Sequence, residues 1–317
     1  MKELLLIHFL ALLIGYSNNR FQKIFTPPPV FTHSYEPLEN EKRLSSFPFI
    51  SGDTYRALAQ VYVDELRLPV DTSKLKNGDI IFVKNGLISY FFNVLRPQMR
   101  THYILVCANS DYSCPGKFFN KLNNDDKMLA WFTTNIDVAF THSKLFPIPL
   151  GIANRYRSSG NIDFLQDFIN KSGNYNKDIL LYFNMNLATK PSVRNEVYEI
   201  FVSKSFCYQG MRKPWREYLI DLASSKFVLS PHGNGLDCYR TWEALLLGCI
   251  PIVKTSTLDP LYTDLPVIIV KDWHEVTEDF LNTKWQEMQH TTYNKEKMFA
   301  GYWLNQIKKC QQDFLQS

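Results

Sequence analysis

Short apolar runs rich in β-branched residues alternate with stretches of helical periodicity along most of the chain. Such runs are typical of buried strands, and the stretches between them are typical of amphipathic helices. The alternation predicts an α/β fold with mainly parallel sheets. Strands are expected at 79–83, 103–106, 128–132, 146–152, 178–183, 227–230, 250–253 and 265–270. Helices are expected at 54–66, 87–95, 163–169, 192–201 with Ser192 as its N-cap, 216–224, 241–247 and 293–314.

The N-terminus carries a separate apolar run at residues 4–16, LLLIHFLALLIGY. A helix of this length rises about 20 Å, less than the roughly 30 Å of a bilayer's hydrocarbon core. We therefore predict that residues 1–20 are a hydrophobic targeting or anchor segment. A cleaved signal peptide, a short signal-anchor, an anchor lying on a membrane surface and an apolar element packed on the fold all stay open.

Two stretches divide the rest of the chain. Pro27–Pro29 form a stiff, non-helical linker after the apolar segment. The polar passage 153–177 interrupts the strand–helix alternation. Length alone suggests about two domains. We therefore predict two α/β domains, at 21–160 and 161–317.

Composition narrows the class of protein. Hydrophobic residues make up 45% and charged residues 21% of the 317 positions, which excludes a disordered or fibrous chain. Thirty-five Lys and Arg against 31 Asp and Glu leave a net charge of +4. That excess is too small to predict nucleic-acid binding, although a local pocket for one anion remains open. The six cysteines form no C-x-x-C pair and no zinc-like spacing, so no metal site is predicted.

The stretch 227–253 contains most of the candidate ligand-binding residues. It predicts a strand, a glycine-containing loop, a helix closed by Gly248 and a second strand. The loop contributes His232, Gly233, Asn234 and Gly235. Glycines let the backbone take positive φ and approach a ligand, and amides at a helix start favour an anion.

The helix adds two charged residues three positions apart. Arg240 can hold a phosphate in a forked pair, and Glu243 can accept two sugar hydroxyls. That order of groups fits a nucleoside diphosphate. Two alternatives to a ligand site stay open. The loop is an ordinary turn, or Arg240 and Glu243 form an ion pair that only stabilises the helix.

The exostosin-like glycosyltransferases have a C-terminal signature that resembles three pieces of this chain: Ser230-Pro231-x-Gly233, Arg240-x-x-Glu243-Ala244 and Gly248-Cys249-Ile250-Pro251. The resemblance is strongest between Asp178 and Asp272. It implies a GT-B fold, in which two Rossmann-like domains face each other across a cleft. It also implies that 161–317 binds a nucleotide sugar, that 21–160 binds the acceptor, and that the terminal helix crosses back to the N-terminal domain.

The resemblance further implies roles for single residues. Glu243 would bind ribose and Arg240 the diphosphate. Thr255, Ser256, Thr257 and Leu258 resemble the stretch that lines the base and ribose. Arg194 is a further diphosphate candidate, whose alternative is a solvated helix arginine.

No motif identifies a catalytic base, which an inverting transfer needs within reach of the acceptor hydroxyl. Asp111 is the first candidate because it follows a predicted strand at the edge where α/β sites open. His102 and His142 are the next candidates. The alternative for Asp111 is that it shapes the loop through an Asx turn. The alternative for His102 is a hydrogen-bonded histidine at the edge of the sheet, without a role in catalysis.

The sequence therefore predicts a glycosyltransferase that moves a sugar from a nucleotide-diphosphate donor to a glycan hydroxyl. A UDP-sugar is the first candidate for the donor. We expect the transfer to invert the anomeric configuration and to need no metal. We expect no cofactor, because the nucleotide sugar is a co-substrate. The alternatives are a non-catalytic glycan- or nucleotide-binding protein and a GT-B sugar-nucleotide epimerase. Location stays open between the lumen of the Golgi or endoplasmic reticulum and the cytoplasmic face of a membrane.

Overall fold

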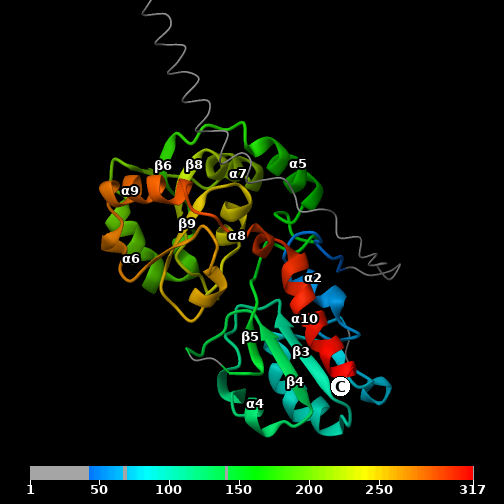
Figure 1. The fold of residues 1–317 in the computed structure, drawn as a ribbon. Coiled ribbons are helices and arrows are strands. Elements are labelled where there is room, and N and C mark those ends of the chain that lie inside the picture. Colours follow the sequence, from blue (N-terminus) through cyan, green and yellow to red (C-terminus); the bar gives the residue numbers. More distant parts are fainter. Residues whose placement is uncertain (1–42, 67–69, 140–141, 317) are drawn as a thin grey trace, which may run out of the picture.

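The computed structural model describes residues 43–66, 70–139 and 142–316, so the predicted anchor segment at 1–20 lies outside the described residues. Two five-stranded parallel sheets form two lobes (Figure 1). The predicted α/β class with parallel sheets is confirmed. None of the helices within the described ranges has the length and apolarity needed to span a bilayer.

The first lobe is built on a sheet with the strand order β1-β2-β3-β4-β5. Every residue of β3 is buried, as is typical of a central strand in a parallel sheet covered on both faces. The strands are β1 Val61–Val63, β2 Asp79–Lys84, β3 Tyr103–Ala108, β4 Met128–Thr133 and β5 Leu145–Pro147. The helical segments between them are η2 Thr72–Lys74, η3 Asn85–Leu87, α3 Ile88–Tyr90, η4 Phe91–Leu95, η5 Arg96–Gln98, η6 Gly116–Phe118 and α4 Lys121–Asn124.

The second lobe is built on a sheet with the order β10-β9-β8-β6-β7. The chain leaves β6 toward β7 and returns to β8 on the other side, so a topological switch point lies between β6 and β8. Ligands of open α/β sheets bind at the carboxyl ends of strands flanking such a point. The strands are β6 Ile179–Phe183, β7 Cys207–Gln209, β8 Ser225–Leu229, β9 Ile250–Lys254 and β10 Ile268–Val270. The helices are α5 Ile162–Ser172, η7 Leu187–Thr189, α6 Pro191–Phe201, α7 Trp215–Ala223, α8 Tyr239–Leu246, η8 Asp259–Tyr262, η9 Trp273–Glu275, α9 Glu278–Gln289 and η10 Lys295–Met298.

The C-terminal helix α10, Ala300–Leu315, belongs to the first lobe in space. It contacts β4 and helix α2, Gly52–Leu58, and the two helices lie side by side in Figure 1. Gln311 Nε2 also donates to the carbonyl of Gly78, 2.7 Å away. The expected return of the terminal helix to the N-terminal part of the chain is confirmed.

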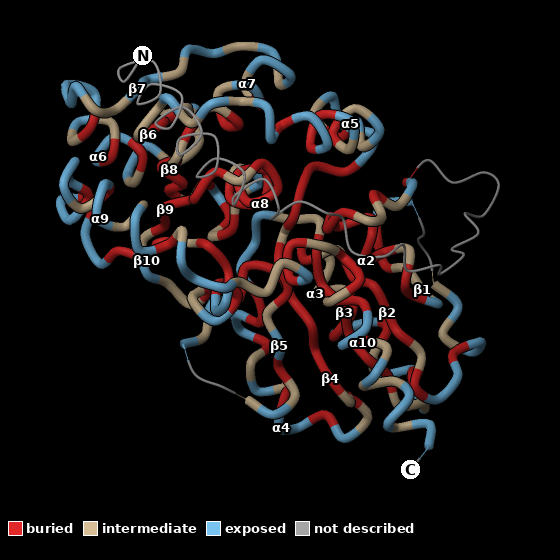
Figure 2. Tube along the Cα trace, turned by 45° about the horizontal axis from the view of Figure 1, so that its top comes forward, coloured by how far each residue is buried: buried red, intermediate tan, exposed pale blue. Residues whose placement is uncertain are grey.

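The apolar core is continuous between the lobes. Both sheets are buried along most of their strands (Figure 2). One cluster of buried side chains contains the first sheet and also Leu165, Trp242 and Tyr262 from the second half. A smaller cluster lies under the second sheet and includes Trp273 and Leu281. The two lobes therefore pack against each other through one continuous apolar interface, which we call the joint.

Several predicted boundaries were wrong. The helix expected at 54–66 ends at Leu58, because the V-Y-V triplet that follows pairs with β2 as strand β1. Helix α6 begins at Pro191 with Lys190 as its N-cap, not Ser192, since proline is pre-set for the first helical position.

Other elements were shorter than expected or were missed. The strand expected at 146–152 ends at Pro147. The terminal helix begins at Ala300 rather than 293, after the short turn η10. Strand β7 and helix α9 were not predicted.

Candidate functional site

A cavity of about 360 Å³ is lined by residues of both halves of the chain. We call it the inter-lobe cavity. The first half contributes Asp111, Leu150 and Ser159. The second half contributes residues at the switch point, among them Arg194, the loop 233–235 and the start of α8.

Arg240 lies in the first turn of α8 and lines this cavity. Its Nη2 atom donates to the carbonyl of Asn184, 2.6 Å away. Its Nε and Nη1 atoms are buried and have no hydrogen-bond partner in the part of the chain that the structure describes. Unsatisfied buried donors on a cation are costly, and the oxygens of a bound anion would satisfy them.

Arg194 lines the same cavity from α6, and its side chain is 7% exposed. It donates to the carbonyls of Asn186 and His232. Burial lowers the pKa of Arg194, and the nearby charge of Arg240 lowers it further. Within the described ranges neither arginine forms an ion pair, so two positive charges face one cavity.

The glycine loop is shaped by close packing. A Cβ atom on Gly233 would lie 3.0 Å from Arg194 Nη2, and one on Gly235 would lie 2.9 Å from Asn135 Nδ2. Neither glycine is among the residues with positive φ, so that part of the sequence argument was wrong. Side chains at these two positions would therefore crowd Arg194 and Asn135, which approach the loop backbone. Gly248 does take positive φ, 66°, just after α8, as predicted.

Glu243 lies one turn after Arg240 on the wall of the cavity and is 4% exposed. Trp215 Nε1 donates to its Oε1 atom over 2.8 Å. Burial raises the pKa of Glu243, while hydrogen bonds from Trp215 and Tyr218 and the charge of Arg240 act against that rise. Glu243 forms no ion pair with Arg240, so the structure does not support the purely structural alternative.

The remaining donor candidates line a second cavity of about 300 Å³, on the other side of the same loop. His232, Thr255 and Ser256 belong to it, near the carboxyl ends of β8 and β9. Thr255 Oγ1 donates to Asp259 over 2.6 Å, and the Ser256 amide donates to the same carboxylate over 2.9 Å. The loop 231–236 thus separates two groups of predicted site residues.

Only one of the three candidate bases reaches the inter-lobe cavity. Asp111 is exposed and lines it, in the loop after β3. His102 precedes β3, contacts Asn77 and packs on Phe314. Because β3 runs toward the cavity, its amino end lies at the opposite edge of the sheet.

His142 lies at that opposite edge as well. It precedes β5, and its Nε2 atom lies 3.0 Å from Asn123 Oδ1. The structure therefore brings Asp111, and neither histidine, to the cavity that holds the two arginines.

Sequence reasoning missed Asp237, which is 5% exposed between the glycine loop and α8. Its carboxylate accepts hydrogen bonds from the amides of Leu150 and Cys238, each over 2.8 Å, and from Trp242 Nε1. Burial raises the pKa of Asp237 to about 6. Its position in the loop four residues ahead of the helix predicted at 241–247 was the signal that could have drawn attention to it.

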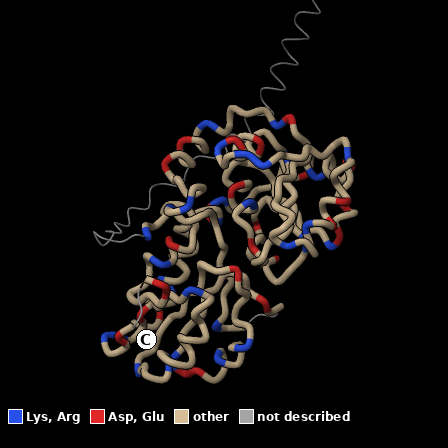
Figure 3. The backbone as a smooth tube through the Cα atoms, turned by 180° about the vertical axis from the view of Figure 1, so that it is seen from behind, with Lys and Arg blue, Asp and Glu red and all other residues tan. Residues whose placement is uncertain are grey.

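Charge elsewhere is mixed, and Lys and Arg alternate with Asp and Glu over both lobes (Figure 3). Among residues 43–66, 70–139 and 142–316, no three His, Cys, Asp or Glu side chains come together as a cation site. The inter-lobe cavity is lined by Arg194 and Arg240, which form no ion pair among the described residues, and by Asp111, Asp237 and Glu243.

A comparison with protein families points to the half of the chain that holds both arginines. A sequence model of the family described as the RXYLT1 C-terminal domain matches residues 183–317. A protein from Danio rerio named ribitol-5-phosphate xylosyltransferase 1 is 27% identical over an alignment of 182 positions that covers 50% of this chain. The chain spans 41% of that relative's length. The chain is similar to a glycosyltransferase; the more specific exostosin-like and GT-B assignments stay predictions.

Proposed function

We propose that this chain is a glycosyltransferase that uses a nucleoside-diphosphate sugar, with its two lobes acting as the halves of a GT-B enzyme. The observation that carries the proposal is the pair Arg194 and Arg240 at the cavity wall, of which Arg240 has two buried nitrogen atoms without a hydrogen-bond partner among the described residues. A diphosphate would supply oxygens for these donors and charge for both guanidinium groups. The similarity to a xylosyltransferase supports it independently.

In this proposal the arginines act on the leaving group. As the bond from the anomeric carbon to the diphosphate oxygen breaks, negative charge builds on the diphosphate. Arg194 and Arg240 are already oriented by the carbonyls of Asn186, His232 and Asn184. Pre-oriented donors stabilise developing charge without reorganisation, so the reaction needs no metal.

Asp111 is the proposed base. An acceptor hydroxyl in the inter-lobe cavity attacks the anomeric carbon from the face opposite the diphosphate, and Asp111 takes its proton. One carbon–oxygen bond forms as the other breaks, which inverts the anomeric configuration. Glu243 binds hydroxyls of the donor, and the cavity beside Thr255 and Ser256 extends the donor site.

The relative's name suggests the first substrates to test. We propose xylosyl transfer from a UDP-sugar to an acceptor that carries ribitol 5-phosphate. Membrane association through residues 1–20 is part of the same proposal.

The test is acceptor-dependent release of UDP by the full chain from UDP-xylose, with a ribitol 5-phosphate glycoside as acceptor. We expect release with wild type and with Arg100→Gln, an exposed arginine before β3. Release should be lost in Arg240→Gln. UDP binding without any release would favour a non-catalytic binding protein. Conversion of the donor without an acceptor would favour an epimerase.

A further inference from the structure

A single side chain connects the loop that carries Asp111 to the loop that leads into α8. Asn135 follows β4 and is 1% exposed. Its Nδ2 atom donates to the carbonyl of Ser110 over 3.0 Å. Its Oδ1 atom accepts from the amide of Asp237 over 2.9 Å. One carboxamide thus spans the two halves of the proposed active site.

Asn135 holds the Asp111 loop at both ends. Its side chain binds Ser110, which precedes Asp111, and its backbone carbonyl accepts from the amide of Cys114 over 3.1 Å. The position of Asp111 in the cavity therefore depends on where Asn135 lies.

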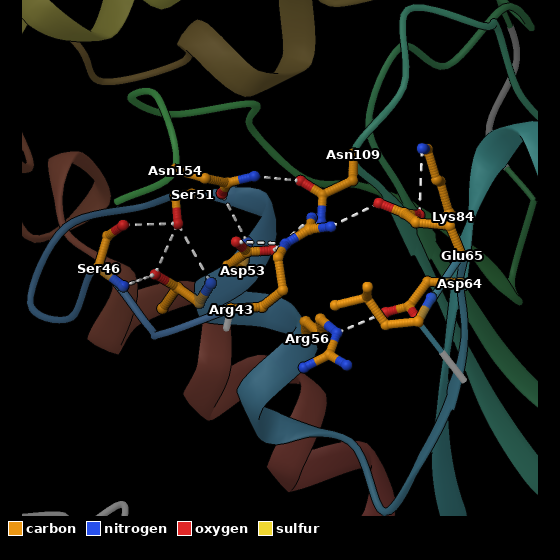
Figure 4. Close-up of polar contacts among 12 residues, drawn as sticks. Arg43, Ser46, Ser51, Asp53, Arg56, Asp64, Glu65, Lys84, Asn109 and Asn154 are labelled. Carbon is orange, nitrogen blue, oxygen red and sulfur yellow. Dashed lines mark hydrogen bonds and ion pairs between the residues drawn. The ribbon is translucent and has the colours of Figure 1, made fainter. Parts of the chain in front are cut away.

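The start of the same loop rests on a second amide. Asn109 donates to Asp53 over 2.9 Å and accepts from Asn154 Nδ2 over 2.8 Å. The backbone amide of Asp53 donates to Asn154 Oδ1 over 2.9 Å, which closes a ring of three residues (Figure 4). The ring fixes the loop to its own lobe, whereas Asn135 fixes it to the other lobe.

On the other side, Asn135 contacts the loop that carries the donor groups. The backbone of Gly235 packs against its carboxamide, so closely that a Cβ atom there would lie 2.9 Å from Nδ2. Asp237, bonded through its amide to Asn135, is held in turn by the Leu150 amide. Arg240 follows three residues later.

From this geometry we propose that Asn135 is a positioning residue that sets the separation between Asp111 and the donor-binding loop. The inference rests on the proposed transferase function. A displaced acceptor lets water compete for the sugar, and a shift of about 1 Å can cost roughly 100-fold in rate. Asn135 therefore controls how the bound donor divides between transfer to the acceptor and hydrolysis.

Asparagine suits this position for two reasons. Its φ of 52° lies in the left-handed region, which asparagine, aspartate and glycine tolerate better than other residues. Its carboxamide also supplies one donor and one acceptor from a single group. Asn135→Gly keeps the backbone conformation and removes both contacts, whereas Asn135→Asp loses the donor to Ser110.

The experiment measures three quantities on the full chain: UDP affinity by calorimetry, the rate of sugar transfer, and the rate of donor hydrolysis. For Asn135→Gly we expect UDP affinity within about 3-fold of wild type, a transfer kcat about 10- to 100-fold lower, and a larger hydrolysed fraction. Asn135→Asp should shift the same ratio in the same direction.

Asn77→Gly is the matched control. Asn77 Oδ1 accepts from the amide of His102 over 2.9 Å, so this variant also removes the contact of a loop carboxamide, but at the edge of the first sheet opposite the cavity. Its transfer-to-hydrolysis ratio should equal that of wild type. An equal shift in Asn77→Gly, or parallel losses of UDP affinity and transfer in Asn135→Gly, would overturn the positioning role. Failure of wild type to bind or turn over the donor would overturn the proposed function, and this inference with it.

Discussion

Two arginines and three carboxylates define the proposed site at the residue scale. Arg194 and Arg240 line the cavity together with Asp111, Asp237 and Glu243, so the two positive charges lie among acidic side chains. Burial raises the pKa of Asp237 even though three kinds of donor surround it. Groups with such perturbed titration concentrate at functional sites.

The raised pKa of Asp237 predicts a specific pH dependence of stability. An aspartate has a pKa of about 3.9 in an unfolded chain, against about 6 here, so the folded state binds the proton more tightly. Stability contributed by this group is therefore lost as pH rises from about 4 to about 6, by roughly 3 kcal/mol in total. Asp237→Asn cannot ionise and should lack this fall, although its unfolding free energy will be lower at every pH.

Urea unfolding between pH 4 and pH 7 checks this expectation. Asp167→Asn, an exposed carboxylate on α5, controls for the removal of one surface charge. Parallel pH profiles for wild type and Asp237→Asn would show that this carboxylate does not titrate as described.

Part of the site was predictable from local spacing and part was not. Arg240 and Glu243 lie one helical turn apart beside a glycine loop, so their spacing of three positions was enough to predict that they are neighbours. Asn135 meets Ser110 and Asp237 across 25 and 102 positions, and no local pattern encodes such contacts. His102 and His142 were placed by residue type alone, without the strand direction that puts them at the far edge.

Strands were predicted better than helix boundaries at the scale of elements. Central strands such as β3 are continuous apolar runs, whose pattern survives any tertiary context. The end of α2 at Leu58 depends on the pairing of Val61–Val63 with β2, a partner about 20 residues away. Helix α9 has a weak apolar face, with Leu281 and Met288 as its buried residues, so its pattern was easily missed.

The terminal helix α10 offers a test of how the elements are assembled. Ile307 is fully buried on the face of α10 that packs on the first lobe. Ile307→Ala should lower the free energy of unfolding by about 2–5 kcal/mol, because it removes apolar contacts and leaves a cavity. Gln312→Ala, on the exposed side of the same helix, should change it by less than about 0.5 kcal/mol. Equal effects of the two variants in urea unfolding would contradict the packing of α10.

At the scale of the whole molecule, a shared joint holds two parallel sheets so that residues of both halves line one cavity. The joint contains apolar residues such as Trp242 and polar contacts from Asn135, Leu150 and Thr257. The second lobe contributes the positive charge, and the first contributes Asp111. On this distribution we base the proposal that the second lobe binds the donor and the first positions the acceptor.

The most direct test of this account is calorimetric titration of the full chain with UDP, GDP and CMP. We predict that one nucleoside diphosphate binds to wild type and equally well to Arg100→Gln. Because Arg240 would lose charge-assisted hydrogen bonds of about 1.5–3 kcal/mol, Arg240→Gln should bind about 10- to 100-fold more weakly. No binding by folded wild type, or equal binding by Arg240→Gln, would contradict the account.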